Sequence, residues 1–203
     1  MKNNSRSNNK VKVRNSKLII AMATVLVICA IFVFLFLNRN AVLKYFYPKK
    51  YEKIVTKYQA EYNVDANLIY AVIKAESNFN NEAESAQGAI GLMQLMENTA
   101  KDVANKNGIE LDSENIRECL LNEDTNINIG TKYLQILIDR YHNIEVALAA
   151  YNAGIGTVDG WIEKGIIHAD GSDIENIPYK ETNNYVRKIL RDYKIYMNLG
   201  DVP

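Results

Sequence analysis

The chain has 203 residues, of which 48% are hydrophobic and 24% are charged, and its formal net charge is zero. This balance excludes a disordered chain and fits one folded domain with an additional segment. Six basic residues and no acidic residue precede Leu18, so the rest of the chain carries 18 basic against 24 acidic residues. An acidic main body argues against nucleic acid as a partner, because phosphate binding needs clustered positive charge, and it is compatible with a polysaccharide.

Leu18 to Leu37 form an uncharged run of 20 residues that is apolar apart from Thr24. A helix of this length spans a hydrocarbon core of ~30 Å, whereas the apolar core of a cleaved signal peptide has only ~7–15 residues. No small-residue cleavage site follows, so we predict a retained transmembrane signal anchor. A cleaved signal peptide and a buried core helix are the alternatives. The positive-inside rule places the basic tail, residues 1–17, in the cytoplasm and the main body outside the cell membrane.

Helical patterns dominate after a predicted juxtamembrane connector at residues 38–50. Asp65 is a predicted N-cap, and Val64 and Ile69 stand where a hydrophobic staple would place them. The absence of a two-residue strand period predicts one all-α domain over residues 51–203. The expected helices are 51–62, 66–77, 92–106, 113–119, 124–141, 144–151 and 180–198, with an irregular excursion at 160–178.

Cysteine and histidine are too sparse for a disulfide or a metal site in the body. Cys29 lies within the apolar run and Cys119 is alone in the body, where a small buried hydrophobe is the expected role. His142 and His168 lie far apart and have no cysteine neighbours, so we predict no metal ligands and no cofactor.

Glu76 is the anomalous residue of the helix predicted at 66–77. It follows Val72 by four residues and Ile73 by three, so it shares their apolar face near the helix C-terminus. Burial and the helix dipole should both raise its pKa, which suits a general acid near neutral pH. The alternative is a surface glutamate at a frayed helix end or in an ion pair.

Four motifs in order resemble the catalytic domain of the soluble-type lytic transglycosylases, relatives of goose-type lysozyme. They are Glu76-Ser-Asn-Phe-Asn80, Gly88-Ala-Ile-Gly-Leu-Met-Gln-Leu-Met96, Ala149-Ala-Tyr-Asn-Ala-Gly-Ile-Gly156 and Pro178-Tyr-Lys-Glu-Thr182 with Tyr185-Val186. The resemblance covers about residues 51–197. The family often has proline at the positions of Asn81 and Glu97, and arginine at that of Asn183.

The resemblance implies a lysozyme-like helical fold with a saccharide-binding cleft. It also implies that Glu76 acts first as acid and then as base at the β-1,4 bond between N-acetylmuramic acid and N-acetylglucosamine. The muramyl 6-hydroxyl attacks the anomeric carbon and leaves a 1,6-anhydro end, so no second carboxylate is needed as nucleophile.

Further residues of the four motifs are expected to form the rest of the site. Tyr185 should lie behind the cleft and bond to Glu76, with an ordinary core tyrosine as the alternative. The lone Trp161 is expected to pack rather than to stack on a sugar. The substrate contacts implied by the resemblance are Ser85, Gln94, Met96, Tyr151, Glu181 and Tyr185.

We therefore expect a single-pass membrane enzyme whose outer domain cleaves peptidoglycan glycan strands as a lytic transglycosylase. The first alternative is a muramidase that uses water at the same site. The second is a glycan-binding scaffold of an envelope machine, without catalysis. Mass spectrometry of the reducing ends separates the first two, because the anhydro product is one water lighter.

Overall fold

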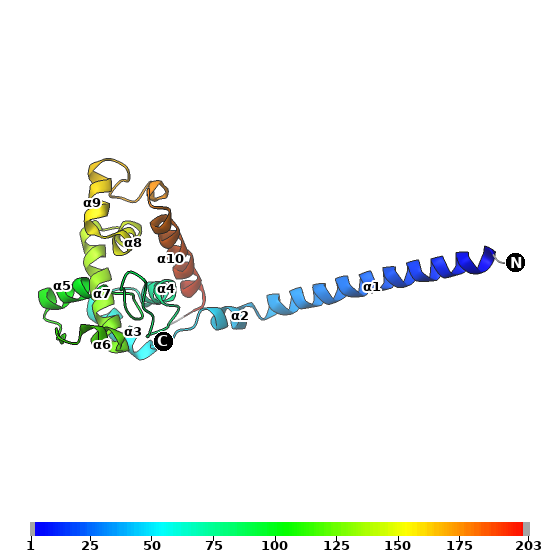
Figure 1. Ribbon diagram of the computed structural model, residues 1–203, viewed down its shortest axis with the longest axis horizontal. Helices are drawn as coiled ribbons and strands as arrows, with labels where there is room; N and C mark the ends of the chain where they lie inside the picture. Colours follow the sequence, from blue (N-terminus) through cyan, green and yellow to red (C-terminus); the bar gives the residue numbers. More distant parts are fainter. Residues whose placement is uncertain (1–2, 201–203) are drawn as a thin grey trace. The chain divides into compact units, whose positions relative to one another are not determined.

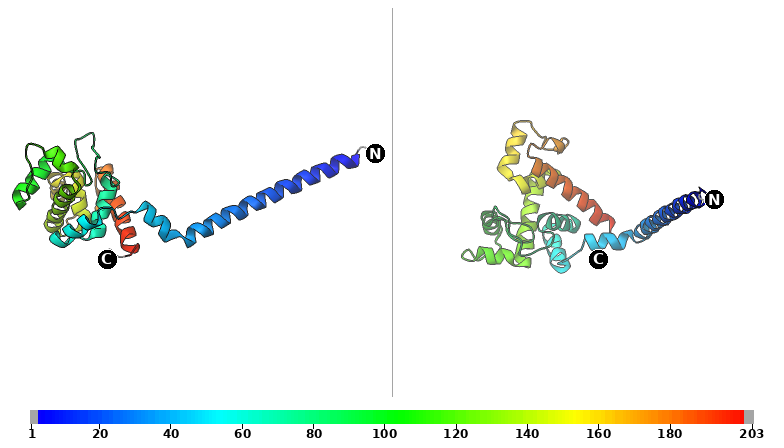
Figure 2. Two further views of the ribbon diagram at one scale, coloured as in Figure 1. Left: turned by 90° about the horizontal axis from the view of Figure 1, so that it is seen from below. Right: turned by 45° about the vertical axis from the view of Figure 1, so that its right-hand side comes forward.

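The computed structural model describes residues 3–200, with side chains from residue 20 onward, and divides the chain into one unit up to Pro48 and another from Lys49. The first unit contains α1 (Asn3–Leu37) and α2 (Arg39–Phe46), which Figure 2 shows in blue. The side chains of Ile20–Leu37 are exposed, and this stretch is long and apolar enough to cross a membrane. The Thr24 hydroxyl donates to the Ile20 carbonyl at 2.8 Å, which satisfies the one polar side chain within the apolar stretch.

The second unit is a bundle of short helices, and Figure 1 shows their arrangement. Among the described residues, extended pairing is limited to isolated bridges that join Ile90 to Glu84 and to Leu95, so the all-α prediction is confirmed. The helices are α3 (Glu52–Tyr62), α4 (Ala66–Glu76), α5 (Glu97–Asn107), α6 (Ile116–Leu121), α7 (Glu123–Tyr141), α8 (Ile144–Ala153), α9 (Ile155–Glu163), the 3₁₀ turn η1 (Ile174–Asn176) and α10 (Lys180–Asn198).

Helix α4 lies at the centre of this unit. All residues from Leu68 to Ile73 are fully or almost fully buried, because α10 covers one side of α4 and α3 covers another. Helix α10 also packs on α8, so it joins the two helices that carry the first and third motifs. The Asp65 side chain accepts a hydrogen bond from the Asn67 amide at 2.8 Å, and the predicted N-cap of α4 is therefore confirmed.

Three predicted boundaries are wrong. The helix expected at 113–119 is observed at Ile116–Leu121, shifted toward the C-terminus. The helix expected at 92–106 begins only at Glu97, because residues 92–95 form a buried turn with Gln94 in the left-handed region at φ 48°. The excursion expected at 160–178 overlaps the end of a regular helix, α9, which begins at Ile155 and buries Val158 and Trp161 three residues apart. Its glycines hide this helix from propensity arguments, since glycine weakens a helix interior by about 1 kcal/mol relative to alanine.

Candidate active site

Glu76 is the last residue of α4, and its side chain is partly buried against α10. The Tyr185 hydroxyl on α10 donates a hydrogen bond of 2.6 Å to Glu76 Oε1, as the sequence predicted. Burial raises the pKa of Tyr185 well above its ordinary value, so this phenol keeps its proton and remains a donor. The pair therefore places a carboxyl group and a permanent donor at the contact between α4 and α10.

The environment of Glu76 favours the protonated acid. Burial raises the pKa of Glu76 from its ordinary value of 4.5 to about 7, while the hydrogen bond from Tyr185 and the charge of Lys188 act in the opposite direction. A carboxyl group with a pKa near 7 is present in both protonation states at neutral pH. It can therefore give a proton in one step and take one back in the next.

The end of α4 is held by side-chain hydrogen bonds. Lys188 Nζ donates to the Ala75 carbonyl at 3.0 Å, which places a cation at the C-terminus of the helix, where the dipole favours it. The Ser77 hydroxyl, next to Glu76, lies 2.8 Å from the Leu92 carbonyl and donates to it. These contacts fix the backbone on both sides of Glu76.

The glycine-containing loop between α4 and α5 is built around the buried side chain of Asn126. Asn126 Oδ1 accepts from the Met93 amide at 2.8 Å, and Asn126 Nδ2 donates to the carbonyls of Ile90 and Leu120 at 3.0 and 2.7 Å. Gly91 at φ 78° lies directly against Asn126, so a side chain there would collide with it. Asn126 was not identified from the sequence, because two of its three hydrogen-bond partners are distant in the chain and no local pattern indicates them.

The polar groups predicted to bind sugar are partly engaged within this loop. The Ser85 hydroxyl accepts from the Ala89 amide at 3.0 Å, and Gln94 Nε2 donates to the carbonyls of Ala83 and Gly91. The Tyr151 hydroxyl donates to the Met93 carbonyl at 2.9 Å. These hydrogen bonds order the side chains in advance, which lowers the entropic cost of binding a ligand against them.

One cleft of about 580 Å³ gathers most of the predicted site residues. Glu76 lies in its wall with Ser85, Gln94, Met96, Tyr151 and Glu181, whereas Tyr185 lies behind Glu76 and does not line it. The only carboxylates among its lining residues are Glu76 and Glu181. The lining residues that were not predicted are Gln87, Ala89, Asn152, Ala153, Tyr179, Lys180 and Thr182.

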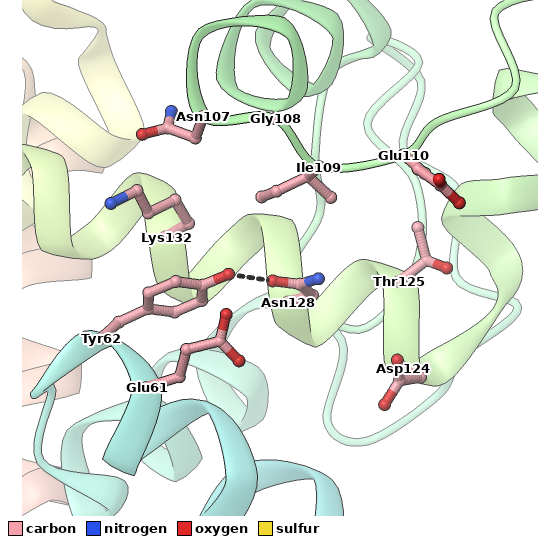
Figure 3. Close-up of a pocket in the computed structure, with 10 residues that line it drawn as sticks. All are labelled: Glu61, Tyr62, Asn107, Gly108, Ile109, Glu110, Asp124, Thr125, Asn128 and Lys132. Atoms are coloured by element: carbon pink, nitrogen blue, oxygen red, sulfur yellow. Dashed lines mark hydrogen bonds between the residues drawn. The ribbon is translucent and has the colours of Figure 1, made fainter.

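A second hollow of about 400 Å³ lies between α3, α7 and the end of α5 (Figure 3). Its wall is polar, with Glu61, Glu110 and Asp124 as acidic residues and Lys132 beside the Tyr62 ring. None of its lining residues belongs to the four motifs. We therefore assign the candidate active site to the cleft that contains Glu76.

Comparison with known proteins finds lytic transglycosylases that are similar to this chain. The soluble lytic murein transglycosylase of Escherichia coli K12 is 34% identical over 161 residues, which cover 77% of this chain and 24% of that protein. The membrane-bound lytic murein transglycosylase C of Yersinia pestis is 38% identical over 118 residues, covering 54% of this chain and 32% of that protein. The chain therefore spans about a quarter to a third of the length of these relatives.

The fold agrees with a solved structure as well. The crystal structure of the 70-kDa soluble lytic transglycosylase from Escherichia coli matches with a TM-score of 0.71 and 33% identity, over 78% of this chain and 26% of that chain. The lysozyme-like fold expected from the sequence is therefore confirmed. The family described as "Transglycosylase SLT domain" matches residues 53–169, more than half of the sequence. The chain belongs to the transglycosylase SLT domain family.

Proposed function

We propose that this protein is a lytic transglycosylase that cleaves the β-1,4 bond between N-acetylmuramic acid and N-acetylglucosamine in peptidoglycan. The observation that carries the proposal is the environment of Glu76, a carboxyl group in the cleft whose pKa burial raises to about 7. The names of the relatives supply the substrate class. The proposed substrate-binding residues are Ser85, Gln94, Met96, Tyr151, Glu181 and Tyr185, the last acting through Glu76.

The proposed reaction uses Glu76 twice. Protonated Glu76 gives its proton to the glycosidic oxygen as the bond from that oxygen to the muramyl C1 breaks. The resulting carboxylate then takes the proton of the muramyl 6-hydroxyl as its oxygen bonds to C1, which closes the 1,6-anhydro ring. Tyr185 donates to Glu76 throughout and stabilises the carboxylate between the two proton transfers. No water is consumed, and the proton returns to Glu76.

The test is product analysis on purified sacculi, with the parent and Glu76→Gln side by side. We expect the parent to release fragments with anhydro ends and Glu76→Gln to lose on the order of 10²–10⁴-fold in rate, since the glutamine amide is not acidic enough to transfer a proton. Hydrated ends alone would identify a muramidase instead. A Glu76→Gln protein that digested sacculi as fast as the parent would contradict catalysis by Glu76.

Glu181 offers a second way to separate the two reactions. An inverting hydrolase needs a second carboxylate about 6.5–9.5 Å from the first to activate water, and Glu181 is the only other carboxylate among the lining residues of the cleft. If the sugar's own hydroxyl attacks, Glu181 serves only in binding, so Glu181→Gln should retain most of the cleavage rate at saturating substrate. A loss as large as that of Glu76→Gln would favour the hydrolase.

We further propose that the protein is a single-pass membrane protein with its enzyme domain outside the cell membrane. The proposed divisions are a cytoplasmic tail at 1–17, the anchor at 18–37, a connector at 38–50 and the enzyme domain at 51–203. The apolar part of α1 and the membrane-bound relative support this proposal. Protease added to intact bacterial spheroplasts should digest the domain and leave a membrane fragment ending soon after residue 37, whereas a protected domain would contradict the orientation.

A further inference from the structure

Tyr179 is an exposed aromatic residue on the wall of the cleft. Its exposed fraction is 56%, and it lines the same hollow as Glu76. Within residues 49–200, the structure leaves three large apolar side chains exposed: Met96, Tyr179 and Met197. Two of these three line the cleft, so the exposed apolar surface of this unit is concentrated where a ligand would lie.

Trp161 of α9 packs against the ring of Tyr179. The two rings meet edge to face, with centroids 5.1 Å apart and planes at 88°. Trp161 itself is only 6% exposed, so it cannot offer a ring face to a large ligand, and the expectation that it packs is confirmed. Such an edge-to-face pair contributes about 0.5–1.5 kcal/mol beyond burial, which favours one orientation of the Tyr179 ring.

Three hydrogen bonds order the chain around Tyr179, and one of them is made by its own backbone carbonyl. The Tyr179 carbonyl accepts from the Asn183 amide at 2.9 Å, and Asn183 Nδ2 donates to the Glu175 carbonyl at 2.8 Å. Three residues after Tyr179, the Thr182 hydroxyl donates to Asn152 Oδ1 at 2.7 Å and so ties the start of α10 to the end of α8. An aromatic ring ordered in this way loses little conformational freedom when it binds a ligand.

We propose that Tyr179 is a stacking platform for one pyranose ring of the glycan strand, and that Trp161 is the residue that positions it. A β-1,4-linked amino sugar carries its hydroxyl and amide groups around the ring and leaves a face of C–H groups, which an aromatic ring can cover. A nucleic acid base could also stack, but a body with 24 acidic against 18 basic residues is unfavourable for its phosphates. The inference rests on the proposed function, because it takes the glycan strand as the ligand.

The chain contains a reporter for this binding. Trp161 is the only tryptophan in the sequence, and it contacts the ring to be tested. The full-length Glu76→Gln protein, held in solution with a mild detergent, would be titrated with soluble peptidoglycan oligosaccharides while the tryptophan emission is followed. The Glu76→Gln background prevents cleavage, and calorimetry gives the affinity independently of fluorescence. We expect a saturable change in emission.

Substitutions at Tyr179 then test the platform. Tyr179→Ala should bind about tenfold more weakly, whereas Tyr179→Phe, which keeps the ring, should stay within about twofold of the parent. Met197→Ala is the matched control, because it removes an exposed apolar side chain that does not line the cleft, and it should leave the affinity unchanged. Circular dichroism would show that each variant remains folded.

A double-mutant cycle tests the positioning role of Trp161. Measured by calorimetry, Trp161→Ala should weaken binding while Trp161→Phe restores it, and Trp161→Ala should cost nothing further in a chain that already carries Tyr179→Ala. If Tyr179→Ala bound oligosaccharide with full affinity while the parent still cleaved sacculi, the inference about Tyr179 would be overturned and the proposed function would stand. A parent protein that neither binds oligosaccharide nor cleaves sacculi would overturn the proposed function and the inference together.

Discussion

The raised pKa of Glu76 has a consequence for stability that can be measured without any activity assay. A carboxyl group whose pKa rises from 4.5 in the unfolded chain to about 7 in the folded chain holds its proton more tightly when folded. Its contribution to stability is therefore complete below about pH 4.5 and is lost as the pH rises through 7. At about 1.4 kcal/mol for each pKa unit, the gap corresponds to about 3 kcal/mol, an upper limit because Glu76 is partly exposed.

Glu76→Gln removes this titration while keeping the shape of the side chain. The glutamine oxygen can still accept from Tyr185, so the principal change is the loss of an ionisable group. We expect the variant to gain stability relative to the parent as the pH rises from 4 to 8, by up to about 3 kcal/mol. Urea unfolding followed by the emission of Trp161 would measure both free energies at each pH.

The control for this experiment is Glu181→Gln, which neutralises a second carboxylate in the same cleft. Glu181 is exposed, so water already solvates its charge and its replacement should change stability much less than that of Glu76. A difference between parent and Glu76→Gln that stays constant from pH 4 to 8 would refute the argument. It would mean that burial does not favour the protonated acid, and the proposed proton transfers would lose their physical basis.

Two further predictions follow from the hydrogen bonds and glycines around the cleft. Tyr185→Phe removes a donor to the Glu76 carboxylate, so the pH above which cleavage of sacculi declines should rise by about one pH unit. The control is Tyr193→Phe, which breaks a 2.7 Å hydrogen bond to Asp65 far along the same helix and should leave this pH unchanged. Equal pH profiles for the two variants would contradict the role of Tyr185. Gly88→Ala places a side chain on a left-handed backbone with open space around it and should lower the free energy of unfolding by about 1–2 kcal/mol. Gly91→Ala has a similar φ but also collides with Asn126, so it should lower the free energy of unfolding by at least twice as much. Chemical denaturation measures both, and equal losses would show that the contact at Gly91 is not tight.

Local sequence patterns predicted the regular helices well and failed in the loop that forms the cleft. The last helix is observed at Lys180–Asn198, as predicted, since its apolar residues recur at helical spacing. The segment 92–95 is also rich in apolar residues, but its buried residues belong to a turn that Asn126 holds through hydrogen bonds from another helix. A pattern of apolar residues cannot separate a buried helix from a buried turn, because it indicates which residues are buried and not which distant residue holds their backbone.

The aromatic residues of the site also show that a local sequence pattern does not indicate which side chain reaches the cleft. Trp161 and Tyr179 are both large aromatic residues near the excursion at 160–178, and the sequence singled out only the tryptophan. Their exposed fractions of 6% and 56% depend on how α9 packs against the start of α10. The position of Tyr179 within the fourth motif was the available signal, but a motif does not say which of its side chains reaches the cleft.

Helix α10 positions several of the groups that surround the Glu76 carboxylate. Tyr179 precedes its first turn, Glu181 lies in that turn, and Tyr185 and Lys188 follow at intervals of four and three residues, which keeps them along one side of the helix. The rim of the cleft, the donor to Glu76 and the cation at the end of α4 are therefore set by the register of a single helix against α4. A slip of α10 by one residue would turn these groups by about 100° and remove all of them together. The fully buried Val186 and Ile189 on this helix oppose such a slip, so the packing of the core and the chemistry of the cleft depend on the same contact.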